Sequence, residues 1–483
     1  MSDDLIVETT TGRVRGKERR GIATWRGVPY ATAARFRAPQ AVEAWTGVRD
    51  ALEFGPFAMQ ARDPRNAMMS GVTDKTAMSE DCLVLNVYAP LGATTDGRRR
   101  PVVVWIHGGA FIMGAGSQPL YDGTSFAANH DVVVVTVNYR LGVLGLLYLG
   151  DLLGDEYREG NAALLDQCAA LAWVRDNIAA FGGDPAAVTV MGESAGAVSV
   201  AHLLAMPAAR GLFHRAILQS GALGLIPRSR EDATAFAAEV ATWLGVAPRE
   251  LPAIAVDRLV AAQLHVSMTR GLGAFSPFVD GVTLPRAPLD LVRDGAAAGV
   301  PLLMGSNRDE WMLFDTFLGH ASTQLIVAQL RERMPNVDRL HERYREARDD
   351  KSEPRAWVDL IGDMAFRIPS IQLAEAHQRH GDVWMYRFDW TTPMLGAAHA
   401  LELPFVFNVI EGPFAQLLLG ADAEKARPLA TAMHAAWAAF IRTGKPDITA
   451  WPTYDTVKRT TYMFDRQSHV VDDPAGELRR LWE

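Results

Sequence analysis

A serine between two glycines is the first residue whose surroundings indicate chemistry. It is Ser194, in the segment Gly192-Glu193-Ser194-Ala195-Gly196. Residues 188–191 read as a short buried strand, and residues 195–206 have the apolar spacing of a helix. A serine at so sharp a strand-to-helix turn is held in a strained conformation, with its hydroxyl exposed above the end of the helix. The pattern predicts a nucleophilic serine, and an ordinary tight turn is the alternative.

A second glycine-rich segment, residues 107–111 (HGGAF), follows an apolar strand. A serine that attacks a carbonyl carbon creates a negative oxygen, which preorganised N–H groups stabilise. Loss of one such donor costs about 2.7–4 kcal/mol. We expect the backbone N–H groups of Gly109, Ala110 and Ala195 to be the donors. Taken alone, the segment is also explained by a simple glycine loop, but the presence of both segments favours an oxyanion hole.

The general base and its acidic partner must follow the serine, in the order serine, acid, histidine. Histidines follow Ser194 at ten positions: His202, His214, His265, His320, His341, His377, His380, His399, His434 and His469. Of these, His399 lies in a loop of small residues after a late strand, from which an imidazole can reach back to the serine. The acid is expected after an earlier strand, and there both Asp309 and Glu310 qualify. His107 precedes the serine and is expected only to shape its loop.

These residues need a scaffold of buried strands. Runs rich in β-branched residues alternate with helical patterns, which predicts a large, mostly parallel sheet with helices on both faces, an α/β fold. The predicted strands are 84–89, 102–106, 132–137, 188–191, 216–219, 301–304, 383–388 and 461–464, and a hairpin is predicted over 5–16. Mostly helical insertions are expected over 228–270 and 309–380. No linker or repeat interrupts the chain, which predicts one domain over residues 1–483.

Composition limits the partners. The 483 residues carry a formal net charge of −8, which argues against nucleic acid and anionic membranes as partners. No apolar stretch approaches the ~20 residues that span a bilayer, and the first residues lack the pattern of a signal peptide. We therefore expect a cytoplasmic protein, of bacterial origin from its alanine and arginine usage, that acts as a monomer or small homo-oligomer.

No metal or other cofactor is expected. His377 and His380 are three residues apart on a predicted helix, but no carboxylate or cysteine cluster accompanies them, so we interpret them as surface residues.

A set of longer segments carries a family resemblance. They are GVPYA (27–31), GVRDALEFGP (47–56), SEDCLVLNVYAP (79–90), WIHGGAF (105–111), NYRLG (138–142), 160–185, GESAGA (192–197), ILQSGA (217–222), GSNRDE (305–310) and HALELPFVF (399–407). In this order, over nearly the whole chain, they resemble the type-B carboxylesterases, the group that includes cholinesterases and bacterial para-nitrobenzyl esterases.

The resemblance implies the α/β-hydrolase fold and a set of site residues. It implies Ser194 as nucleophile, Glu310 rather than Asp309 as acid, His399 as base, and Gly109, Ala110 and Ala195 as the oxyanion hole. It also implies that Glu193 and Ser220 are polar residues beside the triad; the alternatives are a solvated turn residue and a strand-end serine.

The sequence departs from the family at several positions. Thr32-Ala33-Ala34 replaces the usual proline-rich turn after GVPYA, so the N-terminal loop is expected to differ. Family members with a disulfide near the N-terminus pair the cysteine that matches Cys82 with a cysteine at the position of Ala58 here. Cys82 is therefore expected to be a free buried thiol, and Cys168 a packing residue. Trp311 follows the acid where the family often has glycine, and we expect the indole to narrow the pocket or to move the loop.

Side chains that flank these segments are candidates for the substrate pocket, with ordinary core packing as the alternative for each. They are Phe111, Phe278, Trp311, Phe314, Leu318 and Phe405. Such a wall favours short-chain acyl or aryl esters over charged substrates. Methionines at 59, 68, 69 and 78 are expected over the entrance, with a plain surface loop as the alternative.

The sequence thus predicts a serine carboxylesterase that acts on a small-molecule ester through an acyl-enzyme. Hydrolysis of amides, carbamates or thioesters uses the same triad and remains an alternative. A non-catalytic binding protein of the same fold is the other alternative, and the presence of Ser194, Glu310 and His399 together argues against it.

Overall fold

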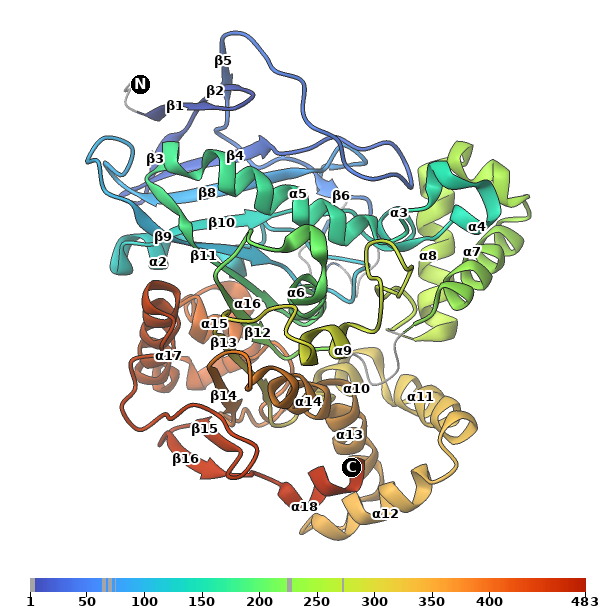
Figure 1. Ribbon diagram of the computed structural model, residues 1–483. Helices are drawn as coiled ribbons and strands as arrows, with labels where there is room; N and C mark the ends of the chain where they lie inside the picture. The colour runs from blue at the N-terminus through green and yellow to red at the C-terminus, as the bar shows by residue number, and fades with distance from the viewer. Residues whose placement is uncertain (1–4, 63–66, 68–71, 74, 224–227, 272) are drawn as a thin grey trace.

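Eleven strands form one central sheet in the computed structural model, which describes residues 5–62, 67, 72–73, 75–223, 228–271 and 273–483. In their order across the sheet they are β16 (His469–Asp472), β15 (Thr460–Phe464), β14 (Val383–Phe388), β13 (Leu302–Asn307), β12 (Arg215–Gln219), β11 (Gly183–Glu193), β9 (Arg100–Ile106), β10 (Val133–Val137), β8 (Val84–Pro90), β4 (Ile22–Pro29) and β3 (Lys17–Arg19). Figure 1 shows the sheet running through the molecule from β3 to β16.

The middle of the sheet is parallel and its edges are antiparallel. Neighbouring strands from β10 to β15 pair in parallel, whereas β8, β4 and β3 on one edge and β16 on the other pair antiparallel. In β9, Val104 pairs with Val135 of β10 and Val190 of β11. These unbroken valine-rich runs suit strands that are buried on both faces.

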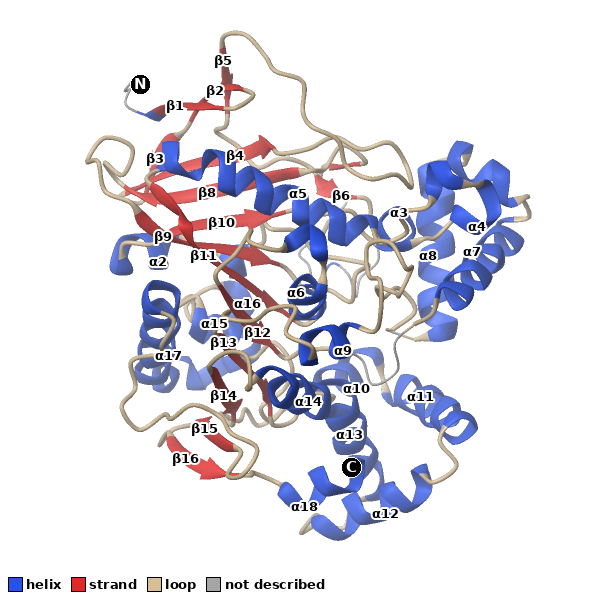
Figure 2. Cartoon of the chain, in the orientation of Figure 1, coloured by secondary structure: helices blue, strands red, loops and turns tan. Residues whose placement is uncertain are grey.

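Side chains of β9 alternate between two hydrophobic cores. Val102, Val104 and Ile106 belong to one core, and Val103 and Trp105 belong to the other. The first core lies under α5 (Ala162–Asn177) and α6 (Ala195–Ala205), and the second under α2 (Thr124–His130) and α17 (Ala423–Thr443). Helices therefore cover both faces of the sheet, as Figure 2 shows, which confirms the predicted fold class. Because both cores share one sheet, the arrangement supports our proposal that residues 1–483 form a single domain.

The expected helical insertions are present. The remaining helices are α3 (Gly142–Leu146), α4 (Gly150–Leu153), α7 (Arg230–Leu244), α8 (Val256–Arg270), α9 (Pro288–Arg293), α10 (Met312–Leu318), α11 (His320–Arg333), α12 (Val337–Ala347), α13 (Glu353–Gly362), α14 (Ile368–His377), α15 (Leu403–Val406), α16 (Pro413–Leu419) and α18 (Gly476–Arg479). A π-helical turn, Asp363–Arg367, joins α13 to α14. In the part of the chain that the structure describes, no helix is both long enough and apolar enough to cross a bilayer.

Smaller strands lie beside the main sheet. β1 (Ile6–Thr9) and β2 (Gly12–Arg15) form the predicted hairpin, which β5 (Val48–Asp50) extends to three strands. β6 (Phe57–Ala58) and β7 (Met78–Ser79) form a separate pair.

Two elements differ from the sequence prediction. β11 is longer than expected and starts at Gly183, because a register shift between Gly183 and Val188 lets the strand keep its pairing with β9. His377 is not a surface residue as predicted: it is fully buried, and its Nε2 lies 2.7 Å from the carbonyl oxygen of Val300. Its polar neighbours in sequence gave no sign of this contact. His380 lies beyond the end of α14.

Candidate active site

The predicted site residues gather at one edge of the sheet. Ser194 follows β11, Ser220 follows β12, and the segments that carry Glu310 and His399 follow β13 and β14. The glycine-rich segment 107–111 follows β9. All of these strands are parallel, so their carboxyl ends meet at the same edge, where open α/β sheets bind their ligands.

The serine turn is the first component of this site. Ser194 has a φ of +55°, and its backbone N–H donates to the carbonyl oxygen of Gln219 (2.9 Å). The flanking glycines are needed for space. A Cβ on Gly196 would lie 2.0 Å from the carbonyl oxygen of Ile106, and one on Gly192 would lie 2.4 Å from the carbonyl carbon of Gly196. The two glycines of the G-x-S-x-G pattern are thus required because the backbone passes close to them on both sides of a strained serine.

The segment 107–111 packs directly against this turn. A Cβ on Gly108 would lie 3.0 Å from the Cβ of Ser194 and 2.6 Å from Oε2 of Glu193, so only glycine lets the two loops touch. Gly109 and Ala110 both have positive φ values, +106° and +52°. Among the described residues, nothing accepts a hydrogen bond from the backbone N–H groups of Gly109, Ala110 or Ala195. Three donors are therefore free beside the serine.

Gln263 of α8 holds the end of the glycine-rich segment by hydrogen bonds. Its Nε2 donates to the carbonyl oxygen of Ile112 (3.1 Å), and its Oε1 accepts from the N–H of Val143 (3.1 Å). Gly142, whose N–H donates to the carbonyl oxygen of Phe111 (2.6 Å), leaves room for this amide. A Cβ there would lie 1.6 Å from Oε1 of Gln263. No local sequence pattern predicts the contact of Gln263 with the glycine-rich segment, because α8 lies more than a hundred residues further along the chain.

Glu310, not Asp309, contacts the imidazole. Nδ1 of His399 donates to Oε2 of Glu310 (2.6 Å), and the N–H of Asn307 donates to Oε1 of the same carboxylate (2.7 Å). Asp309 instead accepts from the N–H of Ala397 (2.7 Å) and so holds the loop that carries His399. The two adjacent acids, which the residues alone could not separate, therefore have different contacts.

A second carboxylate lies on the other side of the imidazole. Nε2 of His399 is 3.0 Å from Oε1 of Glu193, although the two atoms are not aligned as a hydrogen bond. Within the described chain, the hydroxyl of Ser194 has no hydrogen-bond partner and Nε2 does not reach it. The structure thus brings together His399, Glu310 and Glu193, with Ser194 next in the chain to Glu193.

These charges shift the titration of the site. Burial by itself would lower the pKa of His399, but the carboxylates of Glu193 and Glu310 outweigh it and raise the pKa to about 9. Burial, above all, raises the pKa of the Glu193 carboxyl to about 8; Glu402 and Glu310 add to this, and His399 opposes it. Because each group acts on the other, they titrate as a coupled pair.

Glu402 is a further buried acid that sequence reasoning missed. It accepts from Nδ2 of Asn307 (2.6 Å) and from Nε2 of Gln219 (3.1 Å), and burial raises its pKa. Its link to the site runs through Asn307, which also holds Glu310. Ser220, predicted beside the triad, is fully buried with a φ of +49°. No described residue bonds its hydroxyl.

Two phenylalanine rings flank the imidazole. The ring centroids of Phe314 and Phe366 lie 5.1 Å and 4.6 Å from that of His399, and both side chains are partly exposed. Phe366 was not predicted, because it belongs to the π-helical turn, whose irregularity has no periodic signature in the sequence. Trp311 is buried; its indole packs on Phe314 and donates to Oγ1 of Thr323 (3.1 Å).

The other predicted pocket residues have different surroundings. Phe278 packs on Tyr148, and Phe405 packs on Phe388; each is at most 1% exposed, so neither presents surface to a ligand. Phe111 is also buried, whereas Leu318, at the end of α10, is partly exposed.

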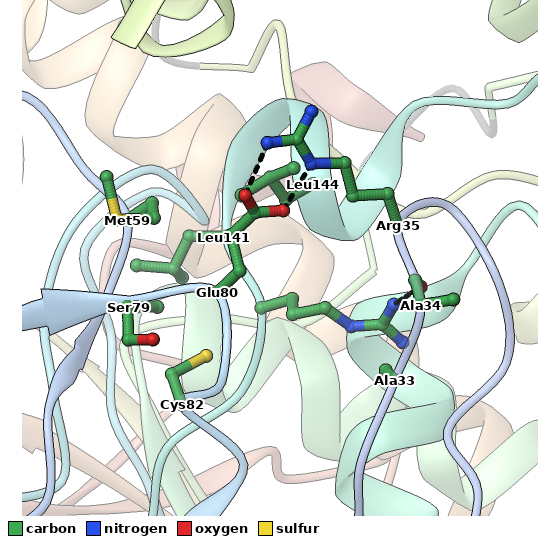
Figure 3. Close-up of a pocket in the computed structure, with 11 residues that line it drawn as sticks. Ala33, Ala34, Arg35, Met59, Ser79, Glu80, Cys82, Leu141 and Leu144 are labelled. Atoms are coloured by element: carbon green, nitrogen blue, oxygen red, sulfur yellow. Dashed lines mark hydrogen bonds and ion pairs between the residues drawn. The ribbon is translucent and has the colours of Figure 1, made fainter. Parts of the chain in front are cut away.

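Both cysteines are free and buried, as expected. Cys82 lines a small cavity of about 10 Å³ together with Ala58, below the ion pair between Arg35 and Glu80, and Figure 3 shows the thiol in this position. Burial raises the pKa of the Cys82 thiol to about 12, so the group stays protonated. Met59 lines the same cavity, whereas Met68 and Met69 lie outside the described residues.

Two further expectations concern histidine and metal. His107 is buried and stacks on Tyr139 (centroids 4.5 Å apart), and burial lowers its pKa to about 4, so it shapes the loop as a neutral side chain. Across the described ranges, no group of three or more His, Cys, Asp or Glu side chains is arranged to hold a metal ion.

Comparison with known proteins gives a consistent result. The model of the carboxylesterase family matches residues 3–479. A para-nitrobenzyl esterase from Bacillus subtilis (strain 168) is 39% identical over 494 residues, with 98% of each chain covered. A phenmedipham hydrolase from Pseudarthrobacter oxydans is 36% identical, covering 98% of this chain and 96% of its own.

A solved structure is similar over the whole fold. A carboxylesterase from Geobacillus stearothermophilus superposes with a TM-score of 0.88 at 41% identity, covering 99% of this chain and 100% of the other. The predicted family and α/β-hydrolase fold are thereby confirmed. Neither alternative is favoured: hydrolysis of amides, carbamates or thioesters by the same triad, or a non-catalytic binding protein. This chain belongs to the carboxylesterase family and is a serine hydrolase of carboxylic esters.

Proposed function

We propose that Ser194, His399 and Glu310 form the catalytic triad of this esterase, with the N–H groups of Gly109, Ala110 and Ala195 as its oxyanion hole. The observation that carries the proposal is the 2.6 Å contact between His399 and Glu310 at the sheet edge where Ser194 is partly exposed. The unpaired N–H groups beside the strained serine add support.

In the first half of the reaction, neutral His399 takes the proton of the Ser194 hydroxyl as its oxygen attacks the ester carbonyl carbon. The negative oxygen of the tetrahedral intermediate accepts hydrogen bonds from the three N–H groups. The C–O bond then breaks, the alcohol leaves with the proton from His399, and an acyl-serine remains. In the second half, water loses a proton to His399 and attacks the acyl carbon. The bond between that carbon and the Ser194 oxygen then breaks, His399 returns the proton to the serine oxygen, and the acid leaves.

Glu310 keeps Nδ1 of His399 protonated, so that Nε2 is the atom that accepts the serine proton. Without substrate, Nε2 faces Glu193, and the reaction requires it to turn toward the neighbouring Ser194. Catalytic hydrogen bonds commonly form fully only in the substrate complex. We assign Glu193 and Ser220 as positioning residues, because both are buried next to the reacting groups.

The substrate is proposed to be an ester with a short acyl or aryl group. The partly exposed rings of Phe314 and Phe366 beside His399 offer an apolar wall, to which Leu318 adds and which Trp311 supports from behind. Phe111, Phe278 and Phe405 are buried and therefore form no part of the proposed contact surface. The name of the para-nitrobenzyl esterase relative points to the same substrate class.

We further propose a cytoplasmic enzyme of bacterial origin that works as a monomer or small homo-oligomer. Two cysteines in 483 residues, both free and buried, suit a reducing compartment. Bacterial sources of the relatives named above support the origin.

Hydrolysis of 4-nitrophenyl acetate by wild type and Ser194→Ala tests the proposed nucleophile. Loss of a triad nucleophile is expected to lower kcat by about a million-fold. Ser468→Ala, at an exposed turn, is the matched control and should leave kcat unchanged. A Ser194→Ala enzyme with near-normal kcat would contradict the assignment. The matched anilide, 4-nitroacetanilide, compares ester with amide hydrolysis.

A further inference from the structure

A hollow lined by arginines lies beside β3, β4 and the segment that leads into α2. These strands are at the opposite end of the sheet order from β16 (Figure 1). Its volume is about 400 Å³, and it is lined by Arg19, Arg20, Arg26, Asp122 and Thr124. We call these five residues the arginine hollow. A volume of this size is within the range of small-molecule sites.

Arg26 is the unusual member of the arginine hollow. Its guanidinium has no hydrogen bond or ion pair with any described residue, and its Nε is buried. The group lies 4.1 Å above the ring of Phe54, which positions it by a cation–π contact. Burial, more than any neighbouring charge, lowers the pKa of Arg26. A half-buried cation without a counter-charge is costly, so such a group commonly has an anionic partner.

The nearby carboxylates are already engaged. Glu53 accepts from Nζ of Lys17 (2.6 Å) and from Nη2 of Arg19 (3.0 Å). Asp122 accepts from the N–H of Thr124 (2.9 Å) and from its hydroxyl, and it pairs with Arg20 (3.3 Å). Four cationic side chains thus meet two carboxylates, which leaves two positive charges unmatched.

We propose that the arginine hollow binds a phosphate-type oxyanion, either free or as the phosphate group of a small monoester. Guanidinium groups recognise phosphate oxygens through paired N–H donors, and a dianion would match the two unmatched charges. In a chain with a net charge of −8, so local an excess of positive charge is not a general property of the surface.

The arginine hollow is separate from the proposed active site. In the sheet order, β4 is separated from β9 by β8 and β10. Within the described chain, the hydrogen bonds of the hollow's side chains go to Leu52, to Glu53 and to one another. Anion binding there is therefore expected to leave the hydrolysis of 4-nitrophenyl acetate unchanged.

Isothermal titration calorimetry of the full chain tests the proposal, with inorganic phosphate and glycerol 3-phosphate as separate probes at constant ionic strength in chloride. Saturable binding of either probe at one site is expected. Equal binding of the two identifies free phosphate as the ligand, and tighter binding of glycerol 3-phosphate identifies a monoester. In Arg26→Gln, binding should weaken about tenfold or more, because a charge-assisted contact is lost.

Arg286→Gln is the matched control, since Arg286 is an exposed arginine paired with Asp294 (2.8 Å) elsewhere on the surface, and it should bind as wild type does. The midpoint of thermal unfolding without anion reports whether Arg26→Gln is folded. If it is not, Arg20→Gln replaces it, because the Arg20 side chain is 78% exposed and we expect its loss to leave the fold intact. Absence of saturable binding in wild type, or equal binding in the folded arginine variant, would overturn the proposal.

Discussion

His399 lies between two carboxylates, and this arrangement decides when it can act as a base. Glu310 orients its Nδ1, and Glu193 faces its Nε2, the atom that has to accept the serine proton. A negative charge on either carboxylate stabilises the imidazolium, which cannot take up a proton. For Glu193 this charge is coupled to that of the imidazole, because the pKa of Glu193 is itself raised to about 8. With Glu193 and Glu310 beside it, His399 therefore becomes available as a base only as the pH rises.

The pH dependence of kcat/KM follows from this reasoning. With the pKa of His399 raised to about 9, kcat/KM is expected to rise from neutral pH toward pH 9 as the imidazolium loses its proton. Glu193→Gln removes one of the charges that raise this pKa, so the rise in kcat/KM of this variant should occur at lower pH. Profiles measured with 4-nitrophenyl acetate check the shift, with the exposed Glu477→Gln as control. An unchanged profile for Glu193→Gln would contradict the proposed role of its charge.

The neighbouring acids Asp309 and Glu310 offer a matched pair of variants. Glu310→Gln removes the carboxylate that orients the imidazole and is expected to lower kcat by about 10⁴-fold. Asp309→Asn keeps that contact and weakens the anchor on Ala397 and the ion pair with Arg308 (3.1 Å), so we expect a loss of about tenfold or less. Steady-state kinetics of the two variants compare them directly, and the reverse order would mean that the assignment of the acid is wrong.

A site residue could be predicted from the sequence when its important contacts are with residues close to it in the chain. Residues whose contacts join distant segments could not be predicted in this way. The serine turn could be predicted, because Gly192 and Gly196 record close approaches within a few residues of Ser194. The choice between Asp309 and Glu310 could not be made from the residues, since both follow β13 and only the contact with His399 separates them. Glu402 and Gln263 act across the fold, and no local pattern marks them.

At the scale of elements, α8 and the π-helical turn carry the features that the helical patterns did not reveal. The expected helices over 228–270 and 309–380 are present, but the pattern cannot say what they touch. α8 delivers the amide of Gln263 to the glycine-rich segment, and the irregular turn at Asp363–Arg367 places Phe366 against His399. Insertions that cover the sheet edge thus also support the reacting groups.

Gln263→Leu tests this support. The change leaves the carbonyl of Ile112 and the N–H of Val143 without their buried partner, so the glycine-rich segment loses its fixed position. Because the oxyanion contacts matter most in the transition state, kcat should fall about ten- to a hundredfold with little change in KM. Gln324→Leu, on the exposed side of α11, is the matched control. A higher KM at normal kcat would instead indicate a role in substrate binding.

At the scale of the whole molecule, the valine-rich strands made the parallel sheet predictable, and its order across the fold emerged only from the pairing. Strands neighbouring in space, such as β9 and β11, are separated by β10 and several helices in the chain. The motifs along the chain identified the family, and close backbone packing explains why glycines occur in them.

The reacting groups stand at the ends of strands that span Arg100 to Phe388, so we expect a fragment that lacks any one of these strands to be inactive. The segment with the nucleophile is synthesised some two hundred residues before the one with the base. During refolding from urea, recovery of 4-nitrophenyl acetate hydrolysis should therefore lag behind recovery of the far-ultraviolet circular dichroism, which reports helices that form early. Simultaneous recovery of both signals would contradict this prediction, because it would mean that activity returns as soon as the secondary structure has formed.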